Sequence, residues 1–388
     1  MSISRKNVPA PLVVLKENGL LLSEHSGLRS PRRQHVRVAG TNEGGQIRET
    51  LNAKLNENGE QQFINQYQLL DEIGRGVFGV VRKAVDLKTG EVYAIKEFSK
   101  SKLRRLTKAA LLRERGPRSP RPPSSPMVSS SNPLDLVRRE IAILKRLNHV
   151  NVASLFEVLD DPDGDSLFMV LEWCGKGVLM KLTLDEIQTP YNEEQCRLYF
   201  RDLVLGIEYL HSRGVIHRDI KPDNLLLNHD DVVKIVDFGV SEMFNRAGDR
   251  AGDGMSSKRV GSPAFMSPEM NNRALISGRA ADVWAMGVTL FCLVTGRLPW
   301  AYANPVELAR AIREDEYELR EDVSLQLRDL IGRMLDKDQQ RRITLSEIRI
   351  HPWVTAEGED VLVSEDENVM VDANYVTASE VALAITSL

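Results

Sequence analysis

The chain has 388 residues, enough for one large domain in two lobes with additional tails. Hydrophobic residues make up 42% of it and charged residues 27%, as in ordinary soluble globular proteins. The net charge of −4 gives no general attraction to nucleic acid or to an anionic membrane, so neither is expected as a partner. The three cysteines, Cys174, Cys196 and Cys292, have no metal-ligand spacing and fit a reducing compartment. We therefore expect a location in the cytoplasm, with the nucleus as a second compartment.

The first half of the chain has strand-like patterns. Residues 1–62 mix basic and polar side chains without a sustained period and are predicted to form a mostly disordered tail. Three strands are then predicted, in "YQLLDEI", "VVRKAVDL" and "EVYAIKEF", and the first two flank a glycine-rich turn. Residues 113–131 are rich in Arg, Pro and Ser, a composition that does not form a core. We predict a small lobe over residues 63–172 that carries this segment as an insert.

Helical periodicity dominates the second half of the chain. The predicted helices span residues 193–212, 281–295, 305–313 and 324–335. The longest apolar stretch, "VWAMGVTLFCLV", is too short to cross a bilayer and is predicted to be a buried helix. Strands followed by helices indicate an α+β fold, in which the small lobe joins a larger helical lobe over residues 173–354. An acidic extension, residues 355–388, follows.

The glycine-rich turn has the pattern G-x-G-x-x-G-x-V. Its residues are Gly74, Gly76, Gly79 and Val81. Because both flanks are strands, the turn is predicted to be the tip of a hairpin and not the helix-opening loop of a dinucleotide site. Glycine allows backbone N–H groups to approach phosphate oxygens without a clash at Cβ. A plain surface hairpin is the alternative interpretation of this pattern.

A lysine and a glutamate are both predicted to lie on apolar faces. Strand alternation places Lys96 on the inward face with Val92 and Ala94. Glu140 lies on the apolar face of a helix that Asn132 is predicted to cap. The other residues on that face are Leu136, Ile143, Leu144 and Leu147. An unpaired buried charge is costly, so we predict that Lys96 pairs with Glu140. Two separate surface ion pairs are the alternative.

The Arg/Pro/Ser-rich insert lies between these two partners in sequence. It falls in the connection from the strand of Lys96 to the helix of Glu140. Lengthening a flexible loop costs only about 0.6 kcal/mol per doubling. The insert is therefore predicted to project into solvent without disturbing the pair.

Two further motifs identify the class of protein. "HRDIKPDN" spans residues 217–224, and "DFG" spans residues 237–239 directly after a short predicted strand. With these motifs the chain resembles a eukaryotic Ser/Thr protein kinase over residues 67–353. It is most similar to the calcium/calmodulin-dependent protein kinase kinases and to fungal SNF1-activating upstream kinases. The resemblance implies a bilobal fold, with a small antiparallel sheet and one regulatory helix in the first lobe. It also implies ATP and Mg²⁺ as cofactors.

The resemblance assigns catalytic roles that fit the chemistry of phosphoryl transfer, which depends on positioning and charge neutralisation. Asp219 would accept the proton of the substrate hydroxyl, and Lys221 would stabilise the phosphoryl group in transfer. Asn224 and Asp237 would hold Mg²⁺. Lys221 favours Ser and Thr over Tyr as acceptors.

The nucleotide site is predicted from the same resemblance. Lys96 would contact the α- and β-phosphates, and Glu140 would hold Lys96 in position. The adenine would lie between Val81 and Ala94, and Leu171 would guard the back of the pocket. Any core could use apolar residues of these kinds, so their assignment depends on their place in the pattern. The full predicted set is Ile73, Gly74, Gly76, Gly79, Val81, Ala94, Lys96, Leu171, Glu172, Cys174, Asn224 and Asp237, with Glu172 and Cys174 offering backbone groups.

Contacts that support the large lobe can also be predicted. Glu269 of "SPE" is expected to pair with Arg342, with the adjacent Arg341 as a competing partner. Asp282 of "DVWAMG" is expected to brace the catalytic loop. The hydroxyl of Ser262 is expected to bridge Asp219 and Lys221.

The chain departs from its relatives' pattern of regulation. Where kinases carry an activating phosphothreonine, four residues before Ser262, this chain has Lys258. A lysine would repel Arg218, the usual ligand of that phosphate. We therefore expect an enzyme that is active without an upstream kinase, as the resemblance also implies.

The flanking segments bear on partners and substrates. The kinase kinases carry a similar Arg/Pro-rich insert, which is linked to recognition of their kinase substrates, so docking and inert linker are the two interpretations of residues 113–131. Calmodulin is a partner by resemblance, but its target is a basic amphipathic helix and residues 355–388 are acidic. We expect an enzyme that phosphorylates activation loops of downstream kinases. An active kinase with unrelated substrates and a catalytically dead scaffold are the alternatives.

Overall fold

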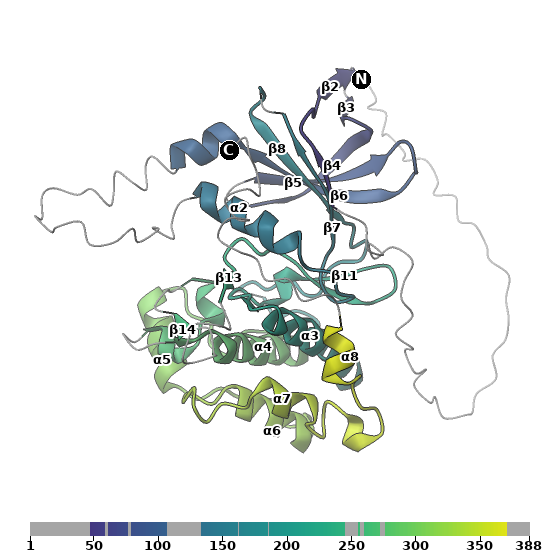
Figure 1. Ribbon diagram of the computed structural model, residues 1–388. Helices are drawn as coiled ribbons and strands as arrows, with labels where there is room; N and C mark the ends of the chain where they lie inside the picture. The colour runs from purple at the N-terminus through teal and green to yellow at the C-terminus, as the bar shows by residue number, and fades with distance from the viewer. Residues whose placement is uncertain are drawn as a thin grey trace, which may run out of the picture. The chain divides into compact units, whose positions relative to one another are not determined.

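The computed structural model describes residues 47–58, 61–76, 79–106, 133–161, 163–184, 186–244, 255–256, 260–271 and 276–370 of the chain. The predictions for residues 1–46, the insert at 113–131, Asn132, Lys258 and residues 371–388 lie outside these ranges. In the described part, strands dominate the first half of the chain and helices the second, as an α+β fold requires (Figure 1).

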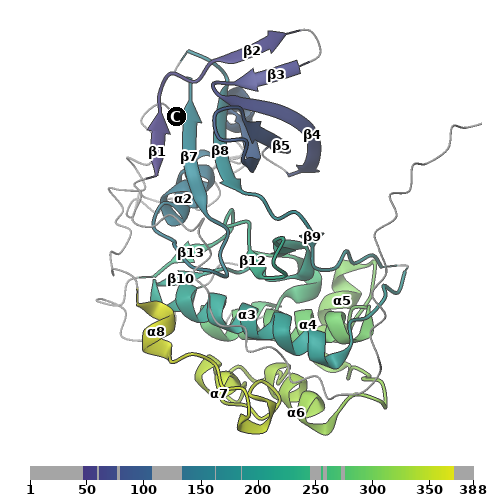
Figure 2. The same ribbon diagram turned by 90° about the vertical axis from the view of Figure 1, so that its right-hand side faces the viewer.

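The small lobe is built on an eight-stranded sheet with the order β1-β7-β8-β6-β5-β4-β3-β2. The three predicted strands are β4 (Tyr67–Arg75), β5 (Gly79–Asp86) and β6 (Val92–Ser99). The sheet continues through β8 (Ser166–Glu172) and β7 (Leu155–Asp160). Neighbouring strands are antiparallel, as predicted, except that β1 (Arg48–Thr50) runs parallel to β7 at the edge (Figure 2).

Ordered structure begins before the predicted boundary at residue 63. The strands β1, β2 (Leu55–Asn58) and the start of β3 (Gln61–Ile64) fall within the tail that was predicted to be mostly disordered, so its described residues 47–58 and 61–62 are ordered. Ile64 and Tyr67 are fully buried in a core beneath this end of the sheet. Strands of three or four residues are too short for alternation to distinguish them from a polar tail.

The helix α2 (Pro133–Leu144) lies beside the sheet and carries Glu140. Val137, Glu140 and Ile141 are buried on one side of it, whereas Leu136, which was predicted on that face, is only half-buried. Residues 100–106 form a further helical segment that was not predicted. Its buried Lys100 pairs with Asp160 at 2.6 Å, which attaches the segment to the sheet.

The large lobe contains the four predicted helices, α3 (Glu193–Ser212), α4 (Gly278–Thr295), α5 (Pro305–Glu314) and α6 (Leu325–Met334), followed by α7 (Leu345–Arg349). Asn192 caps α3 by accepting the N–H of Gln195, and Ser277 caps α4 in the same way. Helix α4 ends at Gly296, whose φ of 72° and close approach to Gln188 exclude a side chain.

Helix α4 contains the long apolar stretch. Among the described residues it is the one helix long and apolar enough to cross a membrane, and 89% of it is buried inside the protein. It lies beside α3 at the centre of the helical part (Figure 2). The prediction of a buried helix is therefore confirmed.

Short strands before α3 and between α3 and α4 form small sheets. β9 (Gly177–Val178), β11 (Leu225–Leu227) and β12 (Val233–Ile235) form one small sheet. The remaining pairs are β10 (Val215–Ile216) with β13 (Glu242–Met243), and β14 (Met255–Ser256) with β15 (Ile276–Ser277). These pairs fix both ends of the loops that carry the "HRD" and "DFG" motifs.

Packed structure also continues past the predicted boundary at residue 354. The short elements η4 (Ala356–Gly358) and α8 (Glu365–Val369) follow, and α8 lies against α3 (Figure 2). The amide of Asn368 donates to the Leu205 carbonyl at 3.0 Å and to Glu208 Oε2 at 2.9 Å, and its Oδ1 lies 2.9 Å from His149 Nε2. His149 belongs to the loop that follows α2, so α8 connects that loop to α3.

Candidate active site

The predicted pair between the strand lysine and the helix glutamate is present. Lys96 Nζ lies 2.6 Å from Glu140 Oε1 and 3.6 Å from Asp237 Oδ1. Burial alone would lower the pKa of Lys96, but the neighbouring carboxylates of Glu140 and Asp237 outweigh it and raise that pKa. The prediction is confirmed, and the alternative of two separate surface pairs is excluded. The geometry leaves a cation beside the "DFG" aspartate.

Strand register places the predicted adenine-contacting residues on the face that carries Lys96. Val81 of β5 lies opposite Lys96 of β6, and Ala94 of β6 lies opposite Leu171 of β8. Ala94 and Lys96 share a face because side chains two apart on a strand point the same way. Three neighbouring strands therefore present Val81, Ala94 and Leu171 next to the lysine.

The glycines of the predicted hairpin have two different functions in the structure. The N–H of Gly76 donates to the Gly79 carbonyl at 2.9 Å, which closes the hairpin between β4 and β5. A Cβ on Gly79 would lie 1.9 Å from the Glu97 carbonyl oxygen, so glycine is required there by the packing of β5 on β6. A Cβ on Gly74 or Gly76 would meet nothing closer than 3.9 Å. The fold therefore does not require glycine at these two positions. Glycine there is consistent with a backbone that a phosphate group approaches closely.

A cavity of about 540 Å³ opens beside the segment that joins the two lobes. Its size suits a small-molecule ligand. The predicted residues Ile73 and Cys174 line it, together with Leu226 of β11. Leu226 was not predicted, although its place two residues after Asn224, between the buried Leu225 and Leu227, could have identified it.

Two polar groups of the joining segment are not available as reactive side chains. Burial raises the pKa of the Cys174 thiol to about 12, so it is neutral at physiological pH. The carboxylate of Glu172 pairs with Lys234 at 2.7 Å, and its N–H donates to the Ser154 carbonyl. Any contribution of Glu172 to a ligand would therefore come from its backbone carbonyl, as the prediction of backbone contacts implies.

The catalytic loop surrounds the carboxylate of Asp219 with donors. Lys221 Nζ donates to Asp219 Oδ2 at 2.8 Å, and the Asn224 amide donates to the same oxygen at 3.0 Å. Burial opposes ionisation, but the hydrogen bond and charge of Lys221, with a hydrogen bond from Ser262, hold the pKa of Asp219 below its usual value. Asp219 is therefore a carboxylate at neutral pH and can accept a hydrogen bond from a substrate hydroxyl.

Ser262 contacts both predicted partners, Asp219 and Lys221. Its hydroxyl accepts a hydrogen bond from Lys221 Nζ at 2.7 Å. Its backbone N–H donates to Asp219 Oδ1 at 2.8 Å. The side chain of Ser262 also hydrogen-bonds to Asp219 and helps to lower its pKa, so the predicted bridge from the hydroxyl to both residues is present, with the backbone contact in addition.

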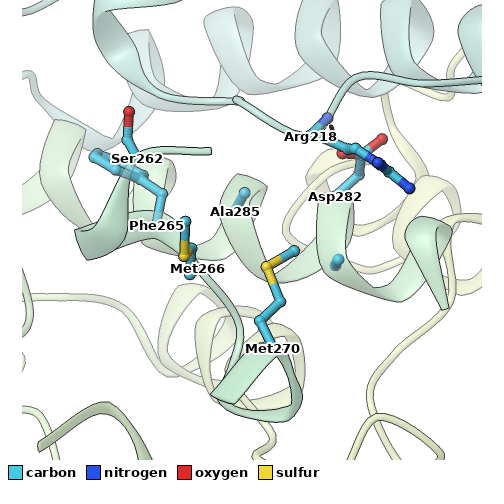
Figure 3. Close-up of a pocket in the computed structure, with 8 residues that line it drawn as sticks. Arg218, Ser262, Phe265, Met266, Met270, Asp282 and Ala285 are labelled. Atoms are coloured by element: carbon cyan, nitrogen blue, oxygen red, sulfur yellow. Dashed lines mark hydrogen bonds between the residues drawn. The ribbon is translucent and has the colours of Figure 1, made fainter. Parts of the chain in front are cut away.

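Asp282 braces the catalytic loop as predicted. Its fully buried carboxylate accepts the backbone N–H groups of His217 at 3.0 Å and Arg218 at 2.9 Å, and lies 2.8 Å from His211 Nε2. Figure 3 shows Arg218 and Asp282 together at one end of a small cavity. Its volume of about 10 Å³ is no more than a single water molecule needs and is too small for a substrate.

The backbone is strained at two positions of the site. Arg218 has φ of 70° and Asp237 has φ of 63°, the left-handed region that non-glycine residues avoid. Such conformations cost about 1–3 kcal/mol each and persist where surrounding contacts enforce them. For Arg218 one enforcing contact is the hydrogen bond of its N–H to Asp282.

The side chains of Asn224 and Asp237 suit Mg²⁺ only if the nucleotide supplies further ligands. Asn224 and Asp237 offer an amide oxygen and a carboxylate, which are the hard ligands that Mg²⁺ prefers. Within the described ranges no group of three or more His, Cys, Asp or Glu side chains could hold a metal ion alone. Magnesium would therefore need further oxygens from nucleotide phosphates, as in other phosphoryl-transfer sites.

The predicted pair of Glu269 with Arg342 is confirmed. Two parallel contacts, of 2.7 and 2.9 Å, join the guanidinium to the carboxylate, and Arg342 is also 5.0 Å from the centre of the Trp284 ring. The competing residue, Arg341, is exposed and contacts Asp336 instead. This buried pair connects the end of the activation segment to the helical core.

Comparison with known proteins agrees with this geometry. The protein kinase domain family matches residues 125–354. A calcium/calmodulin-dependent protein kinase kinase, cmkC of Emericella nidulans, is 43% identical over 376 residues, which are 92% of this chain and 71% of that protein. The calcium/calmodulin-dependent protein kinase kinase of Caenorhabditis elegans is 41% identical over 310 residues, 79% of this chain and 55% of its own length. Serine/threonine-protein kinase ssp1 of Schizosaccharomyces pombe is 38% identical over 385 residues, 96% of this chain and 55% of its own length.

The chain belongs to the protein kinase family. More particularly, it is an ATP-using serine/threonine protein kinase related to the calcium/calmodulin-dependent protein kinase kinases and to ssp1. It spans about half the length of the second and third of these relatives. The predicted fold and enzyme class are thereby confirmed, whereas the roles of single residues, the metal and the substrates stay predictions.

Proposed function

We propose that this kinase phosphorylates activation loops of downstream protein kinases, such as AMP-activated/SNF1-type or calmodulin-dependent kinases. The observation that supports the proposal most is the identity of 43% to a protein kinase kinase over 92% of this chain. Motifs for catalysis alone do not set targets, so a kinase with unrelated substrates is the competing possibility.

In this proposal the described residues divide the chemistry among them. Asp219 orients the acceptor hydroxyl and takes its proton, because its carboxylate is ionised and held by Lys221 and Asn224. Lys221 neutralises charge on the group in transfer, and Lys96 positions the phosphates from the side of the sheet. ATP with Mg²⁺, held by Asn224 and Asp237, would supply the transferable phosphoryl group and additional charge neutralisation.

A catalytically dead scaffold fits the geometry less well. A scaffold needs neither the Lys96–Glu140 pair at 2.6 Å nor an ionised Asp219 with a lysine 2.8 Å away. Both arrangements place charges where a phosphoryl-transfer reaction requires them. The active enzyme is therefore the better explanation.

The purified full chain is expected to transfer phosphate from Mg-ATP to inactive full-length kinases. Wild-type protein and the variant Asp237→Ala are incubated with a panel of dephosphorylated kinases, with and without calcium–calmodulin, and mass spectrometry locates new phosphate. Phosphate on activation-loop threonine or serine, absent with the variant, supports the proposal. Efficient phosphorylation of generic peptides with none of the kinases modified would favour unrelated substrates.

Removal of residues 113–131 is expected to affect kcat/KM differently for folded kinase substrates and for short peptides. If the basic, proline-rich insert docks the substrate, its deletion leaves kcat/KM on a short peptide unchanged and lowers kcat/KM on a folded kinase by about tenfold, the loss of roughly 1.4 kcal/mol of binding. A Gly/Ser replacement of equal length is the matched control, because it retains the spacing and removes the Arg and Pro side chains. Equal losses on both substrates would contradict docking.

A further inference from the structure

The side chain of Arg218 is a buried cation inside the catalytic loop. Only 5% of it is exposed, and its backbone is held at φ of 70° beside Asp282 (Figure 3). A guanidinium removed from water needs an anionic partner, because an uncompensated buried charge destabilises the conformation that buries it. Arg218 directly precedes Asp219. An unpaired Arg218 would therefore destabilise the conformation that positions the Asp219 carboxylate.

The partner is a residue of the chain itself. Arg218 Nη2 contacts Oε2 of Glu242, which is the first residue of β13. Strand pairing with β10 places Glu242 opposite Ile216, two residues before Arg218. The Phe244 N–H donates to the Gly214 carbonyl at 2.8 Å and extends the same pairing. The position of the carboxylate is therefore set by backbone hydrogen bonds on both sides.

A second cation, Arg139, lies near Arg218 and makes a neighbouring carboxylate more important for its stability. Burial lowers the pKa of Arg218 to about 10; the carboxylate of Asp282 opposes this shift, and the positive charge of Arg139 on α2 adds to it. Arg139 is adjacent in sequence to Glu140, the partner of Lys96. The guanidinium that Glu242 contacts therefore senses charges from both the catalytic loop and the helix of the small lobe.

We propose that Glu242 is a positioning residue that holds Arg218, and through it Asp219, in the reactive arrangement without phosphate on the activation segment. In many protein kinases a phosphothreonine supplies the counter-charge for the corresponding arginine, but this sequence has Lys258 at that place. Glu242 provides the missing negative charge from a strand that is already paired. The inference concerns the catalytic reaction and does not depend on which protein is the substrate.

The test compares the variants Glu242→Asp, Glu242→Gln and Glu242→Lys with wild type, all treated with a protein phosphatase and assayed on one generic peptide. E242Q removes only the charge and is expected to lower kcat about tenfold, the loss of one charge-assisted contact, with KM for ATP within twofold. E242D keeps the charge and is expected to retain at least half of kcat, and E242K is expected to lose more than E242Q. Asp322→Asn, an acid-to-amide change in the exposed pair with Arg320, is the matched control and leaves kcat unchanged.

Each outcome of this test bears on the proposed role of Glu242 or on the kinase mechanism. The ordering of the three variants, in phosphatase-treated protein that is folded by circular dichroism, supports the proposal. Wild-type kcat in E242Q overturns it, even if the melting temperature falls, because the pair would then be structural only. An E242Q protein that is unfolded at the assay temperature, or wild-type enzyme that the phosphatase inactivates, overturns it as well. A wild type inactive on every peptide before phosphatase treatment would instead contradict the kinase mechanism itself.

Discussion

Replacing Asp219 with Asn is expected to lower kcat by about 10³-fold, in the middle of the 10²–10⁴ range for a lost general base. The amide keeps the shape of the side chain but cannot take the proton of the acceptor hydroxyl. In the wild-type enzyme, donors from Lys221, Asn224 and the Ser262 N–H surround the ionised carboxylate. After the change, one of these donors would face the amide nitrogen, which cannot accept a hydrogen bond. KM for ATP is expected to change little, because no nucleotide contact is assigned to Asp219. Steady-state kinetics on a peptide with varied ATP measures both constants.

Asp223→Asn is the control for this change. Asp223 belongs to the same loop and its side chain is exposed; Lys221 and Asp219 act on its charge through space, but no hydrogen bond or ion pair joins it to either of them. Its variant is expected to stay within twofold of wild-type kcat. An Asp219→Asn enzyme with a kcat within tenfold of wild type would show that another group takes the proton.

Replacing Arg342 with Ala is expected to lower the free energy of unfolding by about 3–5 kcal/mol, the cost of leaving one member of a buried ion pair without its partner. The carboxylate of Glu269, which is 7% exposed, would lose both guanidinium contacts, and the Ala280 carbonyl would lose a hydrogen bond of 2.9 Å. The face of Trp284 would also lose a cation. Urea denaturation followed by tryptophan fluorescence measures the loss.

The neighbouring arginine provides the comparison. Arg341 is 73% exposed and contacts Asp336 and Asp338 at the surface. Surface pairs of this kind contribute little, so Arg341→Ala is expected to change the free energy of unfolding by no more than about 0.5 kcal/mol. Equal effects of the two substitutions would show that burial of the Glu269 pair does not determine the stability of this lobe.

Features with a local physical signature could be predicted from the sequence. The pair of Lys96 with Glu140 spans 44 residues, yet each partner lies on an apolar face and therefore requires a counter-charge. The long helices could be predicted because periodicity over many residues separates them from strands. Helix α3 has the predicted bounds without correction.

Features that depend on distant backbone could not be predicted. Strand β1 pairs with β7 through residues more than one hundred positions apart, and nothing in its three residues shows this. Glu242 is a single acidic residue in a strand of two, and only the pairing of β13 with β10 brings it to Arg218. Gly79 shows the reverse case, because its pattern suggested a ligand and the structure shows a close approach to the Glu97 carbonyl.

The contacts of α8 have a consequence for how the catalytic domain is isolated. A fragment that stops at residue 354, where the family match ends, would lack Asn368 and Asp360. His149 would then be uncovered next to the helix that positions Glu140, and Arg201 would lose its carboxylate. A fragment that behaves like the enzyme is therefore expected to extend at least through Asn368, because a shorter piece would lose the contacts that connect the loop after α2 to α3.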